Sequence, residues 1–299
     1  MKNILLVTGG SGFVGSNLIE LLLRKTKHKI ISIDNYSSGS KANHITNRRV
    51  KYVSVNTDKI DFALKKYKEN INAIFHFGEF SRIYQSFSKF DECFHSNSIG
   101  TNAVFKFCSD NQIKLIYSAT SASLGSSGLD KNLSPYAFTK AKNLELLENF
   151  KKWFGLKYEV IYFYNVYGPR QICKVDMATV VGIFEDHYLR NKKLPVVRPG
   201  TQTRKFTHVQ DTVEVCYEAW KQNKNRHYSI AAKQNYSIVE LAKLFRIGIQ
   251  YLPKRPGERY ASALNSMNLN NKIYKKIGRI TLKSYVKDFL QKHSFTKKH

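Results

Sequence analysis

Tyr136 and Lys140 are the residues whose types and spacing most directly suggest chemistry in this sequence. Ser134 and Pro135 precede them and are typical of a helix start, because serine caps helices and proline is tolerated in their first turn. A spacing of four residues then places the phenol and the ammonium one turn apart on one helical face. The ammonium would lower the pKa of a phenol that ordinarily titrates at about 10, which would yield a base for a hydroxyl proton.

A glycine-rich segment, residues 8–15, has the pattern of a dinucleotide-phosphate site. It follows an apolar run, precedes an amphipathic stretch, and has its glycines in a GxxGxxG spacing. Without Cβ atoms the backbone can approach a pyrophosphate, and the free amides at the start of the following helix face the anion. The predicted cofactor residues here are Gly9, Gly12, Phe13, Val14 and Gly15.

Acidic residues follow the next two predicted strands. Asp34, followed by Asn35, lies about 20 residues beyond the last glycine, where a carboxylate accepts hydrogen bonds from the adenine ribose. It would repel a 2′-phosphate, so NAD is preferred over NADP; a turn role for Asp34 is compatible with this one. Asp58, next to Lys59, is a candidate for the adenine edge, and a helix-capping role is equally consistent with its position.

The elements that position these residues alternate between strands and helices. Strands are predicted at residues 3–8, 29–34, 51–54, 73–77, 114–118 and 158–163, and helices at 12–25, 58–69, 91–110 and 135–154. This βαβ pattern predicts a Rossmann-type α/β fold with a doubly wound parallel sheet.

The alternation weakens after residue 164, where helices are predicted near 180–190, 238–245 and 282–292 and a strand at 195–198. We predict an NAD-binding domain over residues 1–164. Residues 165–299 are predicted to be a smaller, mainly substrate-binding α/β region, of which some segments, such as a helix starting near Asp211, pack back on the first domain.

Composition excludes several protein classes. With 42% hydrophobic and 24% charged residues, the chain is that of a globular protein, and the apolar run at residues 4–7 is too short to span a membrane. Four scattered cysteines favour a reducing cytoplasm, and neither they nor the scattered histidines form a metal-binding pattern. The net charge of +27 is dispersed, so we predict no specific nucleic-acid partner.

Together, the motifs resemble those of extended short-chain dehydrogenase/reductases, in the NAD-dependent nucleotide-sugar epimerase/dehydratase family. The pattern is most similar to that of UDP-glucose 4-epimerases and runs from Lys2 to about Leu290. Besides the segments above, it includes residues 75–76, Asn97 with 100–101, 118–125, 165–171, 203–209 and 255–258.

The resemblance implies roles for individual residues. Tyr136 would be the base, Lys140 its partner and a ribose contact, and Thr120 a second hydroxyl at the reacting oxygen. Asn165, Arg204 and Arg255 would surround the substrate pyrophosphate, since a planar guanidinium suits phosphate oxygens. The expected NAD contacts also include Lys59, Phe77, Gly78 and Asn97.

The resemblance also implies a homodimer that forms through helices 91–110 and 135–154. Four apolar residues of these helices would lie in that interface, although they could equally belong to the core: Phe94, Phe105, Leu144 and Leu147.

Two departures from the family pattern bear on the reaction. Where dehydratases carry Asp-Glu after the threonine, this chain has Ser121 and Ala122, so a 4,6-dehydratase is not expected. Where many relatives have two alanines after the fourth strand, it has Gly78 and Glu79. This substitution puts a carboxylate near either the nicotinamide or the sugar.

The expected function is inversion of carbon 4 of a nucleotide-linked hexose, with a UDP-sugar favoured, through a transient 4-keto intermediate. A 4-dehydrogenase, a reductase or a 3,5-epimerase-reductase would use the same site. An inactive RNA-binding relative is the non-enzymatic alternative, but it would not need Tyr136 and Lys140. The resemblance further implies a role in cell-surface polysaccharide synthesis.

Overall fold

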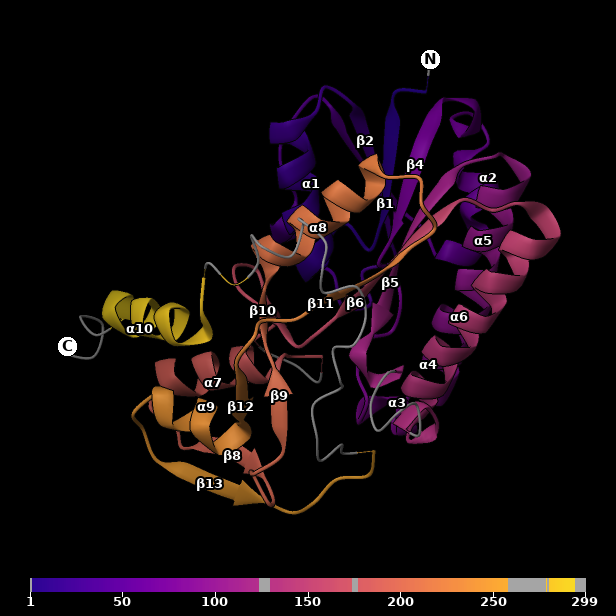
Figure 1. Cartoon of the computed structure of the whole chain (residues 1–299). Helices are drawn as coiled ribbons and strands as arrows, with labels where there is room; N and C mark the ends of the chain where they lie inside the picture. Colours follow the sequence, from indigo (N-terminus) through magenta and orange to yellow (C-terminus); the bar gives the residue numbers. More distant parts are fainter. Residues whose placement is uncertain (1, 124–129, 174–176, 258–277, 279, 294–299) are drawn as a thin grey trace.

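The computed structural model describes residues 2–123, 130–173, 177–257, 278 and 280–293. Its centre is a seven-stranded parallel sheet in the order β11-β6-β5-β4-β1-β2-β3 (Figure 1). The strands are β1 Ile4–Thr8, β2 Lys29–Asp34, β3 Val50–Ser54, β4 Ile71–His76, β5 Lys114–Thr120, β6 Tyr158–Phe163 and β11 His227–Ile230. The predicted doubly wound α/β fold is confirmed, and the strand order reverses between β1 and β4.

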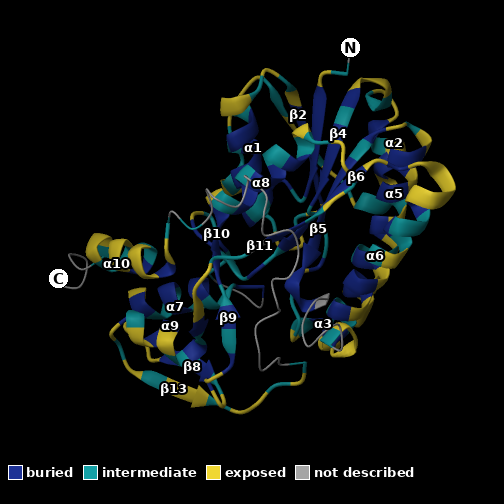
Figure 2. Ribbon diagram, viewed as in Figure 1, coloured by how far each residue is buried: buried dark blue, intermediate teal, exposed yellow. Residues whose placement is uncertain are grey.

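Helices cover both faces of this sheet (Figure 1). One face packs with α2 Ile60–Leu64, α5 Thr101–Asp110 and α6 Pro135–Phe154, and the other with α1 Phe13–Lys25 and α8 Val209–Lys221. The central strands are buried, and exposed residues lie on the outer sides of the helices (Figure 2). Such burial on both faces explains why the strands are almost continuously apolar.

Two predicted helices are interrupted. Residues 58–69 contain the 3-10 turn Thr57–Lys59, the short α2 and a second 3-10 turn, Lys68–Asn70. Lys65 and Lys68, spaced three apart, disfavour a continuous helix by charge repulsion. Residues 91–110 form α4 Phe90–Phe94, the π-helical turn His95–Gly100 and α5.

The C-terminal part of the chain contributes both to the layers around the central sheet and to a second hydrophobic core. α8 packs against α1, and β11 extends the central sheet by pairing with β6. A separate core is formed by α7 Val180–Leu189, α9 Ile238–Leu244 and α10 Leu282–His293 with β8 Leu194–Val197. β8 pairs with β13 Ile249–Leu252, β9 Thr203–Lys205 pairs with β12 Asn235–Ser237, and β7 Val166–Tyr167 pairs with β10 Thr207–His208.

Helix α6 presents the Tyr136 and Lys140 pair, and both of its ends follow from the sequence. Ser134 caps its start by accepting a hydrogen bond from the amide of Ala137 (3.1 Å), with Pro135 as first residue. Gly155 ends it in the left-handed conformation, with φ of +68°. No helix in the described part of the chain has the length and apolar character to span a bilayer.

Gly155→Ala should lower the free energy of unfolding by about 1 kcal/mol, because a residue with a Cβ atom disfavours the left-handed conformation. No atom lies within 4 Å of the added Cβ, so only the backbone conformation is tested. Urea unfolding measures the change. Gly155→Asn is the matched control and should lose less, since asparagine tolerates this region. An alanine variant as stable as the unmodified protein would contradict the expectation.

Candidate active site

A cavity of about 870 Å³ lies at the carboxyl ends of the central strands. Its walls include the loops after β1, β2, β4 and β5, the first turns of α1 and α6, and parts of α7, β8 and β9. In open parallel sheets the point where strand order reverses is where ligands bind, and here it faces this cavity.

The glycine-rich turn forms one wall of the cavity. Gly9 has φ of +68°, and a Cβ there would lie 2.9 Å from the Cα of Gly78. A Cβ on Gly15 would lie 2.2 Å from the carbonyl oxygen of Gly9. Gly12 precedes α1 without a side-chain cap, and with Phe13 and Val14 it lines the cavity. The turn is thus built only for glycine and presents an uncapped helix start, as a phosphate requires.

Asp34 lies at the end of β2, also on the cavity wall with Asn35. Its carboxylate accepts hydrogen bonds from the amides of Ser11 (2.9 Å) and Tyr36 (2.8 Å). Burial raises the pKa of this carboxyl group, and the amides of Tyr36, Ser11 and Gly12 partly oppose the shift. The structure thus shows the turn role, and these amide bonds leave lone pairs on the carboxylate for the hydroxyl donors that the predicted ribose role requires.

Asp58, Lys59 and Asn97 are not among the residues that line the cavity. Asp58 lies inside a 3-10 turn whose N-cap is Asn56, so its capping role is wrong. Its Oδ1 is buried and has no hydrogen-bond partner within the described residues, next to the cavity-lining Thr57. That oxygen fits an amino donor such as the adenine edge. Lys59 is largely exposed, and its ammonium lies 3.5 Å from Asp58.

Asn97 is a buried residue that connects the segment after β4 to α6 by hydrogen bonds. It is fully buried, its Oδ1 accepts from the amide of Phe80 (2.7 Å), and its Nδ2 donates to the carbonyl of Phe80 (3.1 Å) and to Thr139 (3.2 Å). Its amide group thus holds the segment after β4 against α6. A direct NAD contact, which the family resemblance implied, is not supported by this placement.

The catalytic candidates come from the end of β5 and the first turns of α6. Thr120 ends β5, is buried, and accepts a hydrogen bond from the amide of Ala122 (3.2 Å). Tyr136, in the first turn of α6, is half-buried and packs against the apolar cluster of Phe80 and Met177. Both side chains line the cavity, as Lys140 does.

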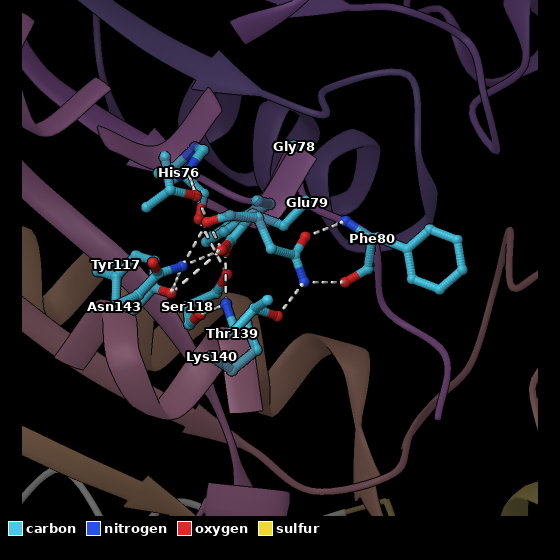
Figure 3. A network of polar contacts seen from close by, with 12 residues as sticks. His76, Gly78, Glu79, Phe80, Tyr117, Ser118, Thr139, Lys140 and Asn143 are labelled. Carbon is cyan, nitrogen blue, oxygen red and sulfur yellow. Dashed lines mark hydrogen bonds and ion pairs between the residues drawn. The ribbon is translucent and has the colours of Figure 1, made fainter. Parts of the chain in front are cut away.

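Lys140 is almost completely buried and has an acidic partner (Figure 3). Its ammonium lies 2.5 Å from Oε2 of Glu79 and also donates to the carbonyl of Ser118. Both side chains are only 4% exposed. Burial lowers the pKa of Lys140, and the Glu79 carboxylate opposes that shift.

Glu79 is held by three further donors (Figure 3). Its Oε1 accepts from Thr101 (3.0 Å), the Tyr117 hydroxyl (3.1 Å) and the Asn143 amide (3.2 Å). Burial raises the pKa of Tyr117 well above its usual value, so this hydroxyl keeps its proton and donates. These donors were not expected from the sequence, although Asn143 follows Lys140 by three residues on the same helical face.

The predicted substrate residues line the same cavity. Arg204, on β9, is buried, and its Nη1 donates to the carbonyl of Thr203 (2.8 Å). The guanidinium of Arg255 lies 4.9 Å from the centre of the Tyr84 ring. Nδ2 of Asn165 donates to the carbonyl of Lys205 (2.9 Å). The structure thus brings two arginines from distant segments to the cavity, together with Arg82, which the sequence analysis did not single out.

The nucleotide-binding turn, the tyrosine and lysine pair and the parallel sheet define a dinucleotide-dependent enzyme of the short-chain dehydrogenase/reductase type. The chain belongs to the NAD-dependent epimerase/dehydratase family, whose model matches residues 5–231. The family to which the sequence patterns pointed is thereby confirmed.

Known proteins resemble the chain over nearly its whole length. A putative UDP-glucose 4-epimerase of Methanocaldococcus jannaschii is 28% identical over 275 residues, covering 86% of this chain and 88% of the relative. A UDP-N-acetylglucosamine 4-epimerase of Methanobrevibacter ruminantium, solved with UDP-N-acetylmuramic acid, has a TM-score of 0.85 and 26% identity, with 98% and 100% coverage. A Thermotoga maritima UDP-glucose 4-epimerase has the same fold, with a TM-score of 0.86, 24% identity, and 99% and 100% coverage.

The residues present fit NAD, the cofactor of this family. The glycine turn leaves room for a pyrophosphate, Asp34 offers a carboxylate to a ribose, and Asp58 has an unpaired buried oxygen. Phe77 and Gly78 line the same wall. Within the described ranges, no group of three or more His, Cys, Asp or Glu side chains is arranged to hold a metal ion.

Asp34→Ala should reduce the preference for NAD over NADP, because it removes the carboxylate that would repel a 2′-phosphate. Titration of both cofactors, followed by the fluorescence of their reduced forms, measures the ratio of dissociation constants. Asp61→Ala, on the neighbouring α2, is the control and should leave that ratio unchanged. Equal affinities for NAD and NADP in the unmodified protein would show that Asp34 does not select the cofactor.

Glu79→Ala should lower the free energy of unfolding at neutral pH by about 3 kcal/mol, since it leaves a buried ammonium without its counterion. The double variant Glu79→Ala with Lys140→Met should lose less than the two single variants together, because both charges leave at once. Urea unfolding of the four proteins gives the coupling energy.

The exposed pair Lys106 and Asp110, 2.8 Å apart, provides the matched control for this cycle. Lys106→Ala should change stability little, because solvent screens exposed ion pairs. A loss for Glu79→Ala no larger than that of the control would refute a buried, charged pair.

Proposed function

We propose that the protein is an NAD-dependent UDP-hexose 4-epimerase. The observation that supports this most is the joint placement of Thr120, Tyr136 and Lys140 on the cavity that also contains the nucleotide-binding turn. The 4-epimerase relatives, which cover 86% and 98% of the chain, support the choice of reaction and of a UDP-sugar. The reaction and the UDP-sugar are both parts of this proposal.

The mechanism follows from the side chains on the cavity wall. Tyr136 removes the proton of the hydroxyl on carbon 4, and Thr120 holds the same oxygen by a hydrogen bond. When bound, NAD supplies the acceptor, and later the donor, of a hydride. Arg204 and Arg255 hold the diphosphate while the 4-keto sugar rotates within the cavity and presents its other face. Tyr136 then returns the proton to the oxygen on the inverted carbon.

Glu79 does not take part in an elimination in this account. Its two carboxylate oxygens are engaged by Lys140, Thr101, Tyr117 and Asn143, so it is bound within the protein rather than free for a sugar proton. Ser121 and Ala122, where dehydratases carry their acid pair, are buried and bear no carboxylate. Loss of water from the sugar is therefore not proposed.

A net 4-dehydrogenase is the second candidate function, because it would use the same three residues and differ only in releasing the 4-keto sugar. A role limited to RNA binding gains no support from the structure, since such a role needs neither the glycine turn nor the buried lysine. We also propose that the protein acts in the cytoplasm. Its product would be a sugar precursor for cell-surface polysaccharides.

We also propose a homodimer through the face formed by α4, the π-turn and α6. Phe94 (41% exposed), Ile99 (49%) and Phe138 (43%) lie there, and Phe90 stacks on Phe94. By contrast, Phe105 and Leu147 are buried core residues, and Leu144 is partly buried. Light scattering of the purified chain and of Phe94→Glu tests whether this face pairs two copies.

Incubation with a panel of UDP- and GDP-hexoses, analysed by NMR, should yield a 4-epimer at equilibrium without net formation of NADH. Tyr136→Phe should lower the rate at least about a hundredfold, because it removes the group that transfers the proton. Tyr251→Phe, at an exposed position, is the control and should retain full activity.

Three outcomes would contradict the proposed reaction. A stoichiometric 4-keto product with NADH would identify a dehydrogenase, and a 4-keto-6-deoxy sugar would identify a dehydratase. Activity of Tyr136→Phe within a few fold of the unmodified protein would remove the assigned base.

A further inference from the structure

Arg82 lies on the segment that follows β4 and lines the same cavity as Tyr136. Two neighbours of Arg82 in this segment contact the tyrosine: the Phe80 ring belongs to the cluster against which Tyr136 packs, and Ser86 accepts a hydrogen bond from the Tyr136 amide (3.3 Å). Arg82 is half-buried and lines the cavity. Arg82 thus lies, in sequence, between two residues whose surroundings include Tyr136.

The guanidinium of Arg82 is fixed on one side only. Nε donates to the carbonyl of Met177 (2.7 Å), a residue of the same cluster as Phe80, and Nη1 donates to the carbonyl (2.8 Å) and hydroxyl (3.2 Å) of Ser81. Nη2 makes no hydrogen bond to any described residue. Met177 contributes both this anchor and part of the Tyr136 environment, so the guanidinium and the tyrosine belong to one wall of the cavity.

Three described groups in this region, Lys140, Tyr117 and Cys93, supply no uncompensated positive charge. Lys140, on α6, is in contact with the Glu79 carboxylate, so the charges of that pair largely cancel at a distance. Tyr117, on β5, and Cys93, on α4, are neutral because burial raises the pKa of each.

Arg82 keeps its charge in this position. Burial lowers its pKa to about 10, and the negative charge of an ionised Tyr136 opposes that shift. The side chain is therefore cationic throughout the neutral range, and it interacts favourably with the ionised form of the phenol.

We propose that Arg82 is a positioning residue that stabilises the Tyr136 phenolate, and so takes over part of the electrostatic role that Lys140 shares with Glu79. The inference rests on the proposed function, in which the phenolate oxygen accepts the proton of the carbon 4 hydroxyl. In that step the O–H bond of the sugar breaks, the O–H bond of Tyr136 forms, and the hydride leaves carbon 4 as its carbonyl forms. On return the same phenol gives the proton back.

The test is the pH dependence of kcat/KM for Arg82→Gln and Arg82→Lys. Loss of the cation should move the acid limb of Arg82→Gln to higher pH by about one unit, and Arg82→Lys should restore most of the shift. Arg255→Gln, which removes a cation from another wall of the cavity, is the matched control: its KM should rise without a comparable shift of the acid limb. A raised KM with an unmoved acid limb in Arg82→Gln would overturn the proposal and make Arg82 a substrate contact.

A second measurement separates this proposal from the proposed function, because it needs no substrate. The ultraviolet difference band of tyrosinate is titrated in the NAD-bound protein, and the signal absent from Tyr136→Phe is assigned to Tyr136. That signal should titrate at higher pH in Arg82→Gln than in the unmodified protein, even if no UDP-sugar is turned over. Identical titration of the two would refute the inference.

Discussion

The contact between the buried ammonium of Lys140 and the buried carboxylate of Glu79 is the interaction on which the site depends. A charged side chain that is 4% exposed is costly unless it is paired and hydrogen-bonded, so the structure must bring an acid to it. That acid comes from the segment that follows β4, and its second oxygen is fixed by donors from β5, α5 and α6. The relative positions of these four elements are therefore tied to one electrostatic requirement.

The same network reaches the nucleotide-binding turn through His76, which Figure 3 labels. Thr101, which donates to Glu79, is bonded to Nε2 of His76 (3.0 Å), and Nδ1 of His76 to the Thr8 hydroxyl (2.7 Å). Burial lowers the pKa of His76 to about 4, so the ring is neutral and one nitrogen donates while the other accepts. The Thr8 hydroxyl also accepts from the amide of Gly78 (2.9 Å), where the glycine turn packs closest. The glycine-rich turn and the Lys140 and Glu79 pair are thus connected by one hydrogen-bond network.

The features that could be predicted from the sequence are those encoded within one short segment of the chain. The strands, the bounds of α6, the glycine turn and the position of Asp34 follow from periodicity, caps and short spacings, which a single segment encodes. The partner of Lys140 could not be reached in this way, because Glu79 is 61 residues away and meets it only through the order of the sheet. The placement of Asn97 and of Arg82 has the same cause, since sequence spacing does not report which side chain points to the cavity. β11 was also missed, because its four residues belong to the sheet through pairing with the distant β6 and not through a pattern of their own.

The central claim is that the site oxidises carbon 4 of a UDP-hexose and reduces it again without releasing the hydrogen. The most direct test uses a UDP-hexose that the protein turns over, deuterated at carbon 4, in ordinary water. The account predicts that the 4-epimer forms with its deuterium retained on carbon 4, as seen by NMR and mass spectrometry. A 4-epimer that has exchanged this deuterium for solvent hydrogen would contradict it, as would the absence of any 4-epimer across the UDP-hexoses.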